Sequence, residues 1–445
     1  MKKNLYFLSL FLSIFLFFLS FYAIMSFEKF NTDNDINMIR FLSSDKMHGR
    51  LPGTYGNTLA ADYIKNHFKS HNLKPYNNDY CESFTVKTPV LNSSLPALNI
   101  KDKNNLIIKK YEYGKDFKES FLSLNNCSFS FSASDKISIK DKCIYVTHNN
   151  SNYSLICTTS LEMRYSYIYD KSAPLSILIT EELYKDIIKS LSQNYIISGN
   201  IPYSVKDSSV CNVEGIIHGF NSSLPPLIIT AHFDHVGYDC NNKIYSGALD
   251  NASGTAFMLS LCNTLSSMLP PERDIVFVAF NCEEYGLLGS KNFVDKNLSK
   301  IKDAKVINFD MIGGSPCSPL TIMTNYNKNS SLYESLKNTA SQKGIPLNFS
   351  SEDMSDHSSF TAKNIDAVTI CDFDTSRIHT AKDTYDKINK ENIERAYNLV
   401  YPEIIKCAYG SHYPFFLYNK STLFISLLLV IFLFFIGTIN KKANN

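Results

Sequence analysis

Two adjacent glutamates, Glu283 and Glu284, lie in the stretch AFNCEEYGLLGS, directly after the apolar run DIVFVAF. Adjacent carboxylates repel one another, and this repulsion is costly at the end of a buried strand unless a cation offsets it. A solvated helix start, where the helix dipole favours acidic side chains, is the other explanation of such a pair. The pair therefore raises the question of a metal ion.

The same arrangement recurs in the second half of the chain, where acidic or histidine side chains directly follow several strand-like apolar runs. In α/β sheets ligands collect at the carboxyl ends of the strands, so we expect these side chains to meet at one edge of a sheet. The residues are His232, Asp234, His235, Asp250, Glu283, Glu284, Asp310 and His379.

These residue types are ligands of divalent metal ions. Three carboxylates and two imidazoles are a suitable set for two ions that share one carboxylate, and one member of the glutamate pair is then free to act as a base. Imidazole and carboxylate without thiolate favour zinc, with manganese or cobalt as alternatives. Taken singly, each residue has an ordinary explanation; Asp250 and Asn251, for example, could cap the next helix. Their recurrence at one kind of position favours a single metal centre.

Strands and helices alternate from Asn212 onward. Short apolar or alternating runs predict strands at NVEGIIHGF, PLIITAHF, DIVFVAFN, AKVINFD, PLTIMT and AVTICDF. Helices are expected at NASGTAFMLSLCNTLSSML, YGLLGSKNFVDKN, SSLYESLKNTASQKG and NKENIERAYNLVYPEIIKCA. Two more helices are expected within residues 33–75, on either side of the turn-rich DKMHGRLPGT. The alternation predicts an α/β fold with a mixed, mostly parallel sheet flanked by helices.

Residues 87–209 have a different pattern. Short β-branched and aromatic runs, such as CIYVTHNN and LSILIT, alternate with polar turns, and only EELYKDIIKSLSQ has the pattern of a helix. Residues suited to catalysis are sparse in this segment. We therefore expect an inserted, mostly β module.

Both ends of the chain carry a long apolar stretch. Residues 5–27 are uncharged and long enough to span a bilayer, and they favour an uncleaved signal anchor over a cleaved signal peptide. Residues 421–440 predict a second transmembrane helix rather than a buried core helix. By the positive-inside rule, the lysines at the outer ends place both termini in the cytoplasm: Lys2, Lys3, Lys441 and Lys442. The chain between the spans would then lie outside the cell membrane.

The overall composition excludes some classes of partner. The 44 basic and 42 acidic residues nearly balance, so no basic excess indicates a nucleic acid. The 11 cysteines form no CxxC pair, and buried reduced thiols such as Cys262 and Cys371 are expected. One or two disulfides in an extracytoplasmic domain are the alternative for Cys81, Cys127, Cys143, Cys157 and Cys211.

Six segments together resemble the M28 family of zinc metallopeptidases, of the aminopeptidase Y and bacterial leucyl aminopeptidase type: TAHFDHVG, SGALDNASGTA, AFNCEEYGLLGS, NFDMIG, SDHSSF and RIHTAKDT. The upstream segment MHGRLPGTYGNTLAADYIKNHF also resembles the family. The resemblance implies a zinc exopeptidase fold, phosphorylase/hydrolase-like. The inserted module takes the place at which many members carry a protease-associated domain.

The predicted organisation follows from these observations. It comprises a signal anchor or signal peptide (1–27), a catalytic domain in two pieces (28–86 and 210–410), an inserted protease-associated-like module (87–209) and a C-terminal transmembrane helix (421–440).

The resemblance also implies which residues bind the metal. Transferred onto this sequence, the family pattern makes Asp250 the ligand that bridges two zinc ions. Glu284 and His379 complete one site, and His232 and Asp310 complete the other. Every expected ligand position carries a residue able to bind zinc, which argues against a non-catalytic, receptor-like member.

Three further roles follow from the same resemblance. Asp234 would orient the imidazole of His232. Glu283 would act as the general base, taking a proton from water and returning it to the leaving amine. His357 corresponds to a position beside the active site.

The expected function is therefore that of a membrane-anchored zinc metallopeptidase that cleaves a peptide or protein substrate, with an aminopeptidase as the first hypothesis. A carboxypeptidase or dipeptidase of the same fold, a glutaminyl cyclase and a receptor-like protein are the alternatives. The sequence leaves the oligomeric state open. Four acids could either recognise a substrate amine or lie on a solvated surface: Glu352, Asp353, Asp372 and Asp374.

Overall fold

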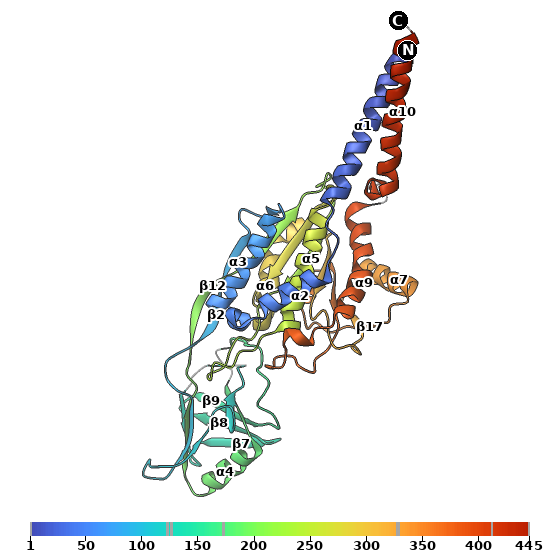
Figure 1. Ribbon diagram of the computed structural model, residues 1–445. Helices are drawn as coiled ribbons and strands as arrows, with labels where there is room; N and C mark the ends of the chain where they lie inside the picture. Colours follow the sequence, from blue (N-terminus) through green and yellow to red (C-terminus); the bar gives the residue numbers. More distant parts are fainter. Residues whose placement is uncertain are drawn as a thin grey trace.

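A nine-stranded mixed sheet forms the core of the largest part of the molecule in this computed structural model, which describes residues 2–121, 124, 128–170, 174–325, 330–410 and 413–443 (Figure 1). The strand order is β1-β12-β14-β13-β15-β18-β16-β17, and β2 pairs with β12. The strands are β1 (Lys74–Pro75), β2 (Cys81–Leu91), β12 (Tyr203–Ile217), β13 (Leu227–His232), β14 (Ile275–Phe280), β15 (Lys305–Phe309), β16 (Leu320–Met323), β17 (Leu347–Ser350) and β18 (Asp366–Cys371).

The four central strands, β14-β13-β15-β18, are parallel to one another. Antiparallel pairing begins on both sides of them, between β14 and β12 and between β18 and β16. Every residue of β13 and β14 is buried, as expected for parallel strands covered on both faces. Alternate residues of β13 belong to different cores: Leu227 and Ile229 pack in one, and Ile228 packs in the other.

Helices cover both faces of this sheet. One face packs against α2 (Thr32–Leu42), α3 (Tyr55–Ser70), α5 (Gly254–Ser266), α7 (Ser331–Lys343) and α9 (Lys390–Tyr409). The other face packs against α6 (Leu288–Ile301) and the short α8 (His357–Thr361). This three-layer arrangement confirms the predicted α/β fold class.

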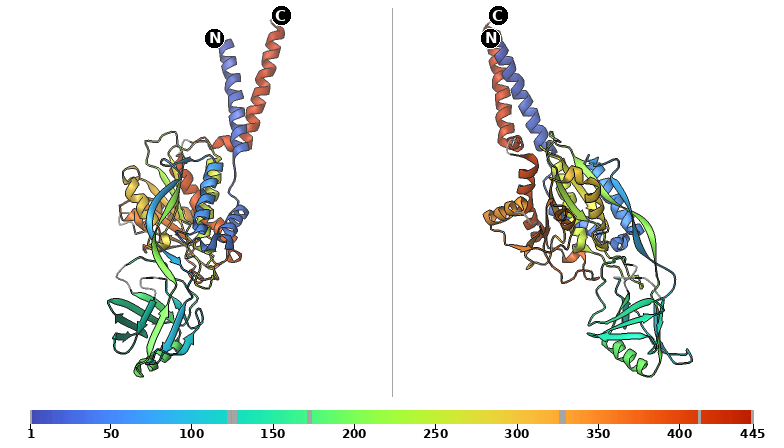
Figure 2. Two further views of the ribbon diagram at one scale, coloured as in Figure 1. Left: turned by 90° about the vertical axis from the view of Figure 1, so that its left-hand side faces the viewer. Right: turned by 180° about the vertical axis from the view of Figure 1, so that it is seen from behind.

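A smaller part of the molecule projects from the sheet on a two-stranded ribbon. Strands β2 and β12 pair antiparallel from Tyr203↔Leu91 to Val213↔Cys81 and lead into two further sheets. One has the order β4-β3-β11-β6 and the other β5-β10-β9-β8-β7, with α4 (Glu181–Ser192) beside them (Figures 1 and 2). The strands are β3 (Ala97–Lys101), β4 (Ile107–Tyr111), β5 (Phe117–Glu119), β6 (Ser128–Phe131), β7 (Lys136–Lys140), β8 (Cys143–His148), β9 (Ser151–Cys157), β10 (Leu175–Ile179) and β11 (Ile196–Asn200).

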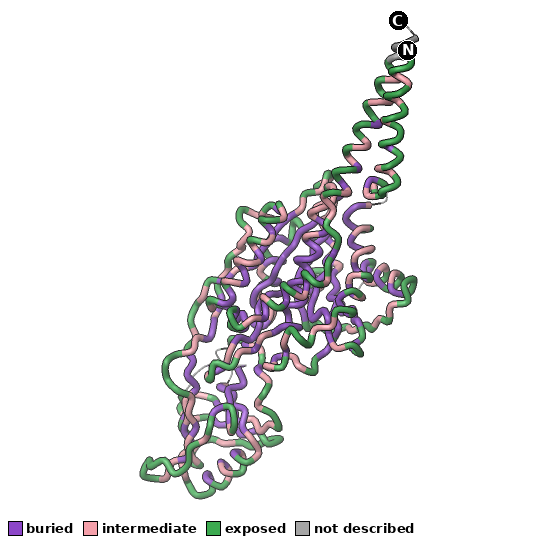
Figure 3. Tube along the Cα trace, in the orientation of Figure 1, coloured by how far each residue is buried: buried purple, intermediate pink, exposed green. Residues whose placement is uncertain are grey.

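The two terminal helices, α1 (Lys2–Ser26) and α10 (Lys420–Ala443), project together from the opposite end of the molecule (Figures 1 and 2). The hydroxyl of Tyr6 donates to the carbonyl of Leu433 at 2.8 Å, and the hydroxyl of Ser20 donates to the carbonyl of Leu417 at 2.6 Å. Both helices are long and apolar enough to cross a membrane, with mean hydropathies of 2.4 and 2.8. Most of their side chains are exposed, unlike those of the central sheet (Figure 3).

The elements expected from residues 212–408 are present with small shifts of their ends, and the helix expected near residue 181 is α4. Strand β17 and the length of the β2–β12 ribbon were not predicted. The ten described cysteines are free thiols, and Cys127 lies outside the described residues. Of the expected buried thiols, Cys262 and Cys371 are both buried.

Candidate metal centre

The histidines and acids expected at strand ends converge at the carboxyl edge of the parallel strands. His232 is the last residue of β13, Glu283 and Glu284 form a short helical turn just after β14, and Asp310 directly follows β15. His379 lies in the loop after β18. Asp250 lies in the turn before α5. Since β14, β13, β15 and β18 are adjacent and parallel, their carboxyl ends bring these side chains to one place.

Four buried side chains form the first group of possible metal ligands: His235, Asp250, Glu284 and His379. The Nε2 atom of His379 lies 3.0 Å from Oε1 of Glu284 and 3.1 Å from Oδ2 of Asp250. The Nδ1 atom of His235 lies 3.1 Å and 3.6 Å from the same two oxygens. Two imidazole nitrogens and two carboxylate oxygens therefore face one another.

A second group contains His232, Glu283 and Asp310. The Nε2 atom of His232 lies 3.4 Å from Oδ1 of Asp310 and 3.5 Å from Oδ1 of Asp250. Asp250 thus directs one oxygen to each group. Its backbone is held in place by Asp383, whose carboxylate accepts hydrogen bonds from the N–H groups of Leu249 and Asp250.

The donors of both groups fit a metal ion by type and by spacing. Neighbouring donors of one tetrahedral zinc ion lie about 3.4 Å apart, since each is about 2.1 Å from the metal. The six measured distances between an imidazole nitrogen and a carboxylate oxygen of the cluster range from 3.0 to 3.6 Å. Oδ1 of Asp310 is buried and has no hydrogen-bond partner among the described residues, as expected for an oxygen that serves as a ligand. The cluster is compatible with metal binding.

The charges within the cluster shift its pKa values strongly. Burial disfavours the charged form of His232, but the negative charges of Glu283 and Asp310 outweigh it and raise the pKa of the imidazole well above its usual value. Burial likewise opposes the ionised form of Glu284, yet His379 and His235 hold the pKa of that carboxyl well below its usual range. Burial, together with the nearby charge of Glu284, raises the pKa of Glu283 well above its usual value. The two neighbouring glutamates therefore lie in opposite electrostatic environments.

Asp234 fixes the turn that carries the two glutamates. Its two carboxylate oxygens accept hydrogen bonds from the N–H groups of Glu283 at 3.1 Å and Glu284 at 3.2 Å. Cys282, just before the pair, has the left-handed φ of 60° that starts this turn. Nδ1 of His232 lies 3.7 Å from Oδ1 of Asp234, which is longer than a hydrogen bond.

Arg50, which was not expected from the sequence, supports the backbone around the cluster through hydrogen bonds. It is fully buried and donates hydrogen bonds to four backbone carbonyls, those of Leu42, Phe233, Ser246 and Gly247. These bonds tie the turn before α3 to the end of β13 and to the loop that carries Asp250. Its position within the family-like MHGR segment was the only signal for it in the sequence.

The smaller part of the molecule, between β2 and β12 and called the inserted module below, also reaches the cluster, through residues that the sequence did not indicate. The hydroxyl of Ser166 donates a hydrogen bond of 2.5 Å to Oε2 of Glu284, and the N–H of Arg164 donates to the carbonyl of His379. The ring of Tyr167 packs edge-on against Tyr285, with 5.0 Å between the ring centroids. No sequence motif marks this segment, because it meets the cluster only through the tertiary fold.

His357 is buried beside the cluster but outside both groups, and its Nδ1 lies 2.8 Å from the hydroxyl of Thr369. Asp310 is held by Ser355, whose hydroxyl donates to its Oδ2 at 2.7 Å. The segment around α8 thus positions one of the candidate ligands.

The interpretation of the four nearby acids as solvated surface was wrong for two of them. Asp372 is buried and accepts hydrogen bonds from the N–H groups of Gly313 and Gly314, and it pairs with Arg395. Asp374 is also buried and bonds to the loop that begins at Ser315. Both carboxylates accept hydrogen bonds from backbone N–H groups of one loop, and those N–H groups need a partner when the loop is buried. This need explains why the two acids are buried. Glu352 and Asp353 are exposed, as expected.

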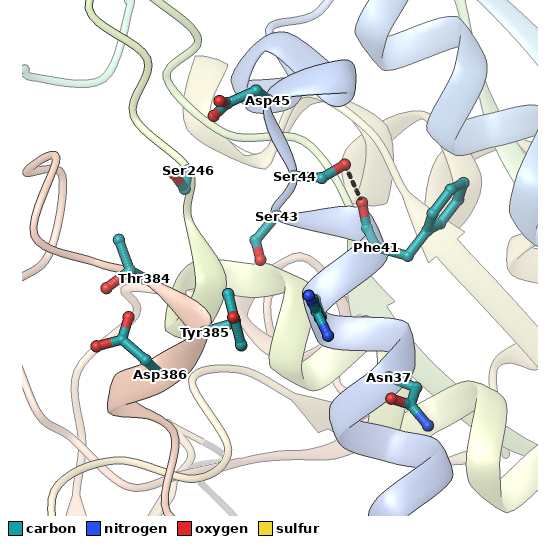
Figure 4. Close-up of a pocket in the computed structure, with 10 residues that line it drawn as sticks. Asn37, Phe41, Ser43, Ser44, Asp45, Ser246, Thr384, Tyr385 and Asp386 are labelled. Atoms are coloured by element: carbon teal, nitrogen blue, oxygen red, sulfur yellow. Dashed lines mark hydrogen bonds between the residues drawn. The ribbon is translucent and has the colours of Figure 1, made fainter.

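A cavity of about 550 Å³ lies near the cluster but does not include it (Figure 4). It opens between α2 and the loop that follows Asp383, and the guanidinium of Arg40 lies 5.2 Å from the ring centre of Tyr385. Its described lining is Asn37, Arg40, Phe41, Ser43, Ser44, Asp45, Ser246, Thr384, Tyr385 and Asp386. None of these residues belongs to the two groups of possible ligands.

Comparison with known proteins agrees with this geometry. Residues 212–404 match Peptidase family M28, which confirms the predicted resemblance for this part of the chain. Aminopeptidase YwaD of Bacillus subtilis is 33% identical over 201 residues, which are 42% of this chain and 43% of that protein. The chain thus spans less than half the length of the curated relatives that it matches.

Two solved structures share the fold. The aminopeptidase from Aneurinibacillus sp. strain AM-1 aligns over 88% of this chain and 97% of its own, with a TM-score of 0.61 and 20% identity. A zinc aminopeptidase from Bacillus subtilis aligns over 86% and 97%, with the same TM-score and identity.

Proposed function

We propose that this chain, whose residues 212–404 match Peptidase family M28, is a zinc-dependent aminopeptidase that is anchored in a membrane. The observation that carries the proposal is the pair of ligand groups that share Asp250 at the carboxyl edge of the parallel strands. The names of the similar proteins, an aminopeptidase and a zinc aminopeptidase, support the metal and the reaction.

In this proposal Asp250, Glu284 and His379 would hold one zinc ion, and Asp250, His232 and Asp310 would hold a second one. Zinc supplies a water of lowered pKa and polarises the carbonyl of the scissile peptide bond. The ligands are buried, and Ser166 bonds to one of them, Glu284.

Glu283 is the proposed general base. Its carboxylate lies in the same group as His232 and Asp310, and Asp234 fixes its backbone through the N–H. From this position it would accept a proton from the attacking water and return it to the amine of the leaving peptide. Asp234 would serve as a positioning residue for the glutamate turn, in addition to its expected role beside His232.

The domain organisation is part of the proposal. Residues 28–86 and 210–410 would form the catalytic domain, and residues 87–209 would form a protease-associated-like module. The contact of Ser166 with Glu284 supports a role of the module at the entrance of the site. The helices α1 and α10 would anchor the protein in the cell membrane, with the catalytic domain outside and both termini in the cytoplasm.

A pair of substrates tests the reaction. The purified full-length protein in detergent, supplied with zinc, should hydrolyse amino-acid anilides and peptides with a free N-terminus. It should not hydrolyse the same peptides after N-acetylation, because an aminopeptidase requires the free amine. Cleavage of N-acetylated peptides from their free C-terminus would contradict the proposal and favour a carboxypeptidase. A zinc-loaded protein that cleaves neither substrate would also contradict it.

A further inference from the structure

We propose that His235 is an additional metal ligand, and that with Asp250, Glu284 and His379 it makes one of the two zinc positions a closed, four-donor site that binds its ion more tightly than the other. The inference rests on the proposed zinc-dependent function and goes beyond it, because the ligand set expected from the sequence does not include His235.

The geometry around His235 carries the proposal. Its side chain is fully buried, and its Nδ1 lies 3.1 Å from Oε1 of Glu284 and 3.6 Å from Oδ2 of Asp250. Nε2 of His379 lies at similar distances, 3.0 and 3.1 Å, from the same two oxygens. The two imidazoles therefore face one point from two sides, with ring planes at 75° to each other.

The backbone provides the space for this ring. Gly247, which has a left-handed φ of 56°, packs directly against the imidazole of His235, and a Cβ at this position would overlap the ring. The carbonyl of Gly247 is in turn held by Arg50 through a hydrogen bond of 2.8 Å. The ring of His235 is thus held in its orientation by the glycine loop that also carries Asp250.

The second position has fewer donors. Three atoms face one another there: Nε2 of His232, Oδ1 of Asp310 and Oδ1 of Asp250. Glu283 belongs to the same group, but as the proposed base it would act on water rather than bind the ion. A zinc site closed by four protein donors is typical of a retained ion, whereas a catalytic zinc ion keeps one position open for water or substrate. We infer that the ion at the His235 position is retained, and that the ion beside Glu283 is the exchangeable one that meets water.

The alternative role of His235 is a hydrogen bond from Nδ1–H to Glu284, which would orient that carboxylate without binding metal. An asparagine at position 235 distinguishes the two roles, because it could replace the hydrogen bond but not the metal ligand. An asparagine amide can donate a hydrogen bond from nearly the same place as Nδ1, but it is a poor zinc ligand.

Zinc titration of the metal-stripped, full-length protein in detergent tests the proposal. The wild type should take up two ions in separate events, with affinities at least tenfold apart. In His235→Ser the zinc affinity of the tighter event should fall at least tenfold, and in His235→Asn it should fall by a similar factor. His67→Asn, a change at a histidine on α3 outside both groups, should leave both events unchanged. Wild-type affinity in His235→Asn would overturn the proposal in favour of the hydrogen-bond role.

X-ray absorption of the wild type loaded with one equivalent of zinc tests the same point without any substitution. The first ion should have two imidazole ligands, whereas a single imidazole would overturn the proposal. Failure of the proposed function would look different, because the wild type would then bind no zinc and cleave no peptide. If the wild type cleaves peptides with two bound ions, and both His235 variants bind zinc with wild-type affinity, the role of His235 is overturned while the proposed function stands.

Discussion

At the scale of single residues, Glu283 and Glu284 occupy one turn but have different neighbours. Oε1 of Glu284 lies between the imidazoles of His235 and His379, and its Oε2 accepts a hydrogen bond from Ser166. Glu283 lies beside His232 and belongs to the other group. The mutual repulsion of the two carboxylates is therefore offset by separate partners on the two sides of Asp250.

This asymmetry predicts different effects of one substitution at the two positions. Glu283→Gln should retain both zinc ions and lose turnover by about 100-fold or more, since a general base contributes about 10²–10⁴-fold to a rate. Glu284→Gln should lose one zinc ion, because an amide is a much weaker ligand than a carboxylate. Metal analysis and anilide hydrolysis of both variants would check this, and loss of zinc from Glu283→Gln would assign that residue as a ligand instead.

Asp35 gives a second prediction at this scale, for stability. It is fully buried on α2, where it accepts a hydrogen bond from Ser260 at 2.8 Å and its other oxygen has no partner among the described residues. Burial raises its pKa to about 7, against about 3.9 in an unfolded chain. The folded state therefore holds the proton more tightly, and the free energy of unfolding should fall as the pH rises from about 4 to about 7 and then level off.

Asp35→Asn removes the charge but can keep the bond to Ser260. The variant should match the wild type near pH 4 and exceed it above pH 7, by an amount on the order of a few kcal/mol. Thermal unfolding of the full-length protein in detergent and chelator, from pH 4 to 8, measures the difference. Asp33→Asn, at an exposed position on the same helix, serves as the control. A constant difference between Asp35→Asn and the wild type across this range would contradict the prediction.

At the scale of elements, the inserted module and the central sheet meet at Glu284. The hydroxyl that reaches Oε2 of this residue comes from Ser166, which lies between β9 and β10. The neighbouring N–H of Arg164 bonds to the carbonyl of His379. One segment of the module therefore holds the side chain of Glu284 and the backbone of His379, two residues of the same group of possible ligands.

Ser166→Ala should weaken zinc binding at this position by about 10- to 100-fold, which is the usual cost of removing a side chain that orients a ligand. Ser166→Thr retains the hydroxyl and should stay near the wild type. Competition with a chromophoric chelator measures both affinities. Equal affinity in the alanine variant and the wild type would show that the module does not support this ligand.

Most elements around the site were predictable, because their apolar residues recur at the spacing of a helix or a strand and turn-forming residues mark their ends. The strands β13, β14 and β15 are short, mostly apolar runs, and the acids and histidines lie at their ends or shortly after them. The supporting residues were not predictable in this way. Ser166 is 118 residues from Glu284, and Arg50 is 197 residues from Gly247, so only the folded topology brings each pair together. His235 was visible as a possible ligand, but the sequence does not tell which way its ring faces.

At the scale of the whole molecule, helix α5 separates the cluster of possible ligands from the terminal helices. It begins at Gly254, shortly after Asp250, and its 13 residues correspond to a length of about 20 Å. At its far end Ser267 bonds to Ser26 and Glu28, next to the base of α1. The cluster therefore lies at the end of α5 that is remote from the terminal helices, where Ser166 of the inserted module bonds to Glu284.

The proposed topology can be tested on intact cells that carry the full-length protein with a different epitope tag at each end. Added protease should degrade the catalytic domain and leave both tags attached to protected membrane fragments. This follows because α1 and α10 both project from the same end of the molecule, away from the central sheet (Figure 2). Loss of one tag only would show that a helix does not span the membrane, and protection of the whole chain would reverse the orientation.

The pairing of α1 with α10 also has a practical consequence. The bond between Tyr6 and Leu433 lies near the tip at which both ends of the chain emerge. A fluorescent donor fused to one end and an acceptor fused to the other would therefore start close together, at the end of the molecule farthest from the inserted module. Their energy transfer would report in living cells whether the two helices remain paired. The chain between the two helices would stay free of any label.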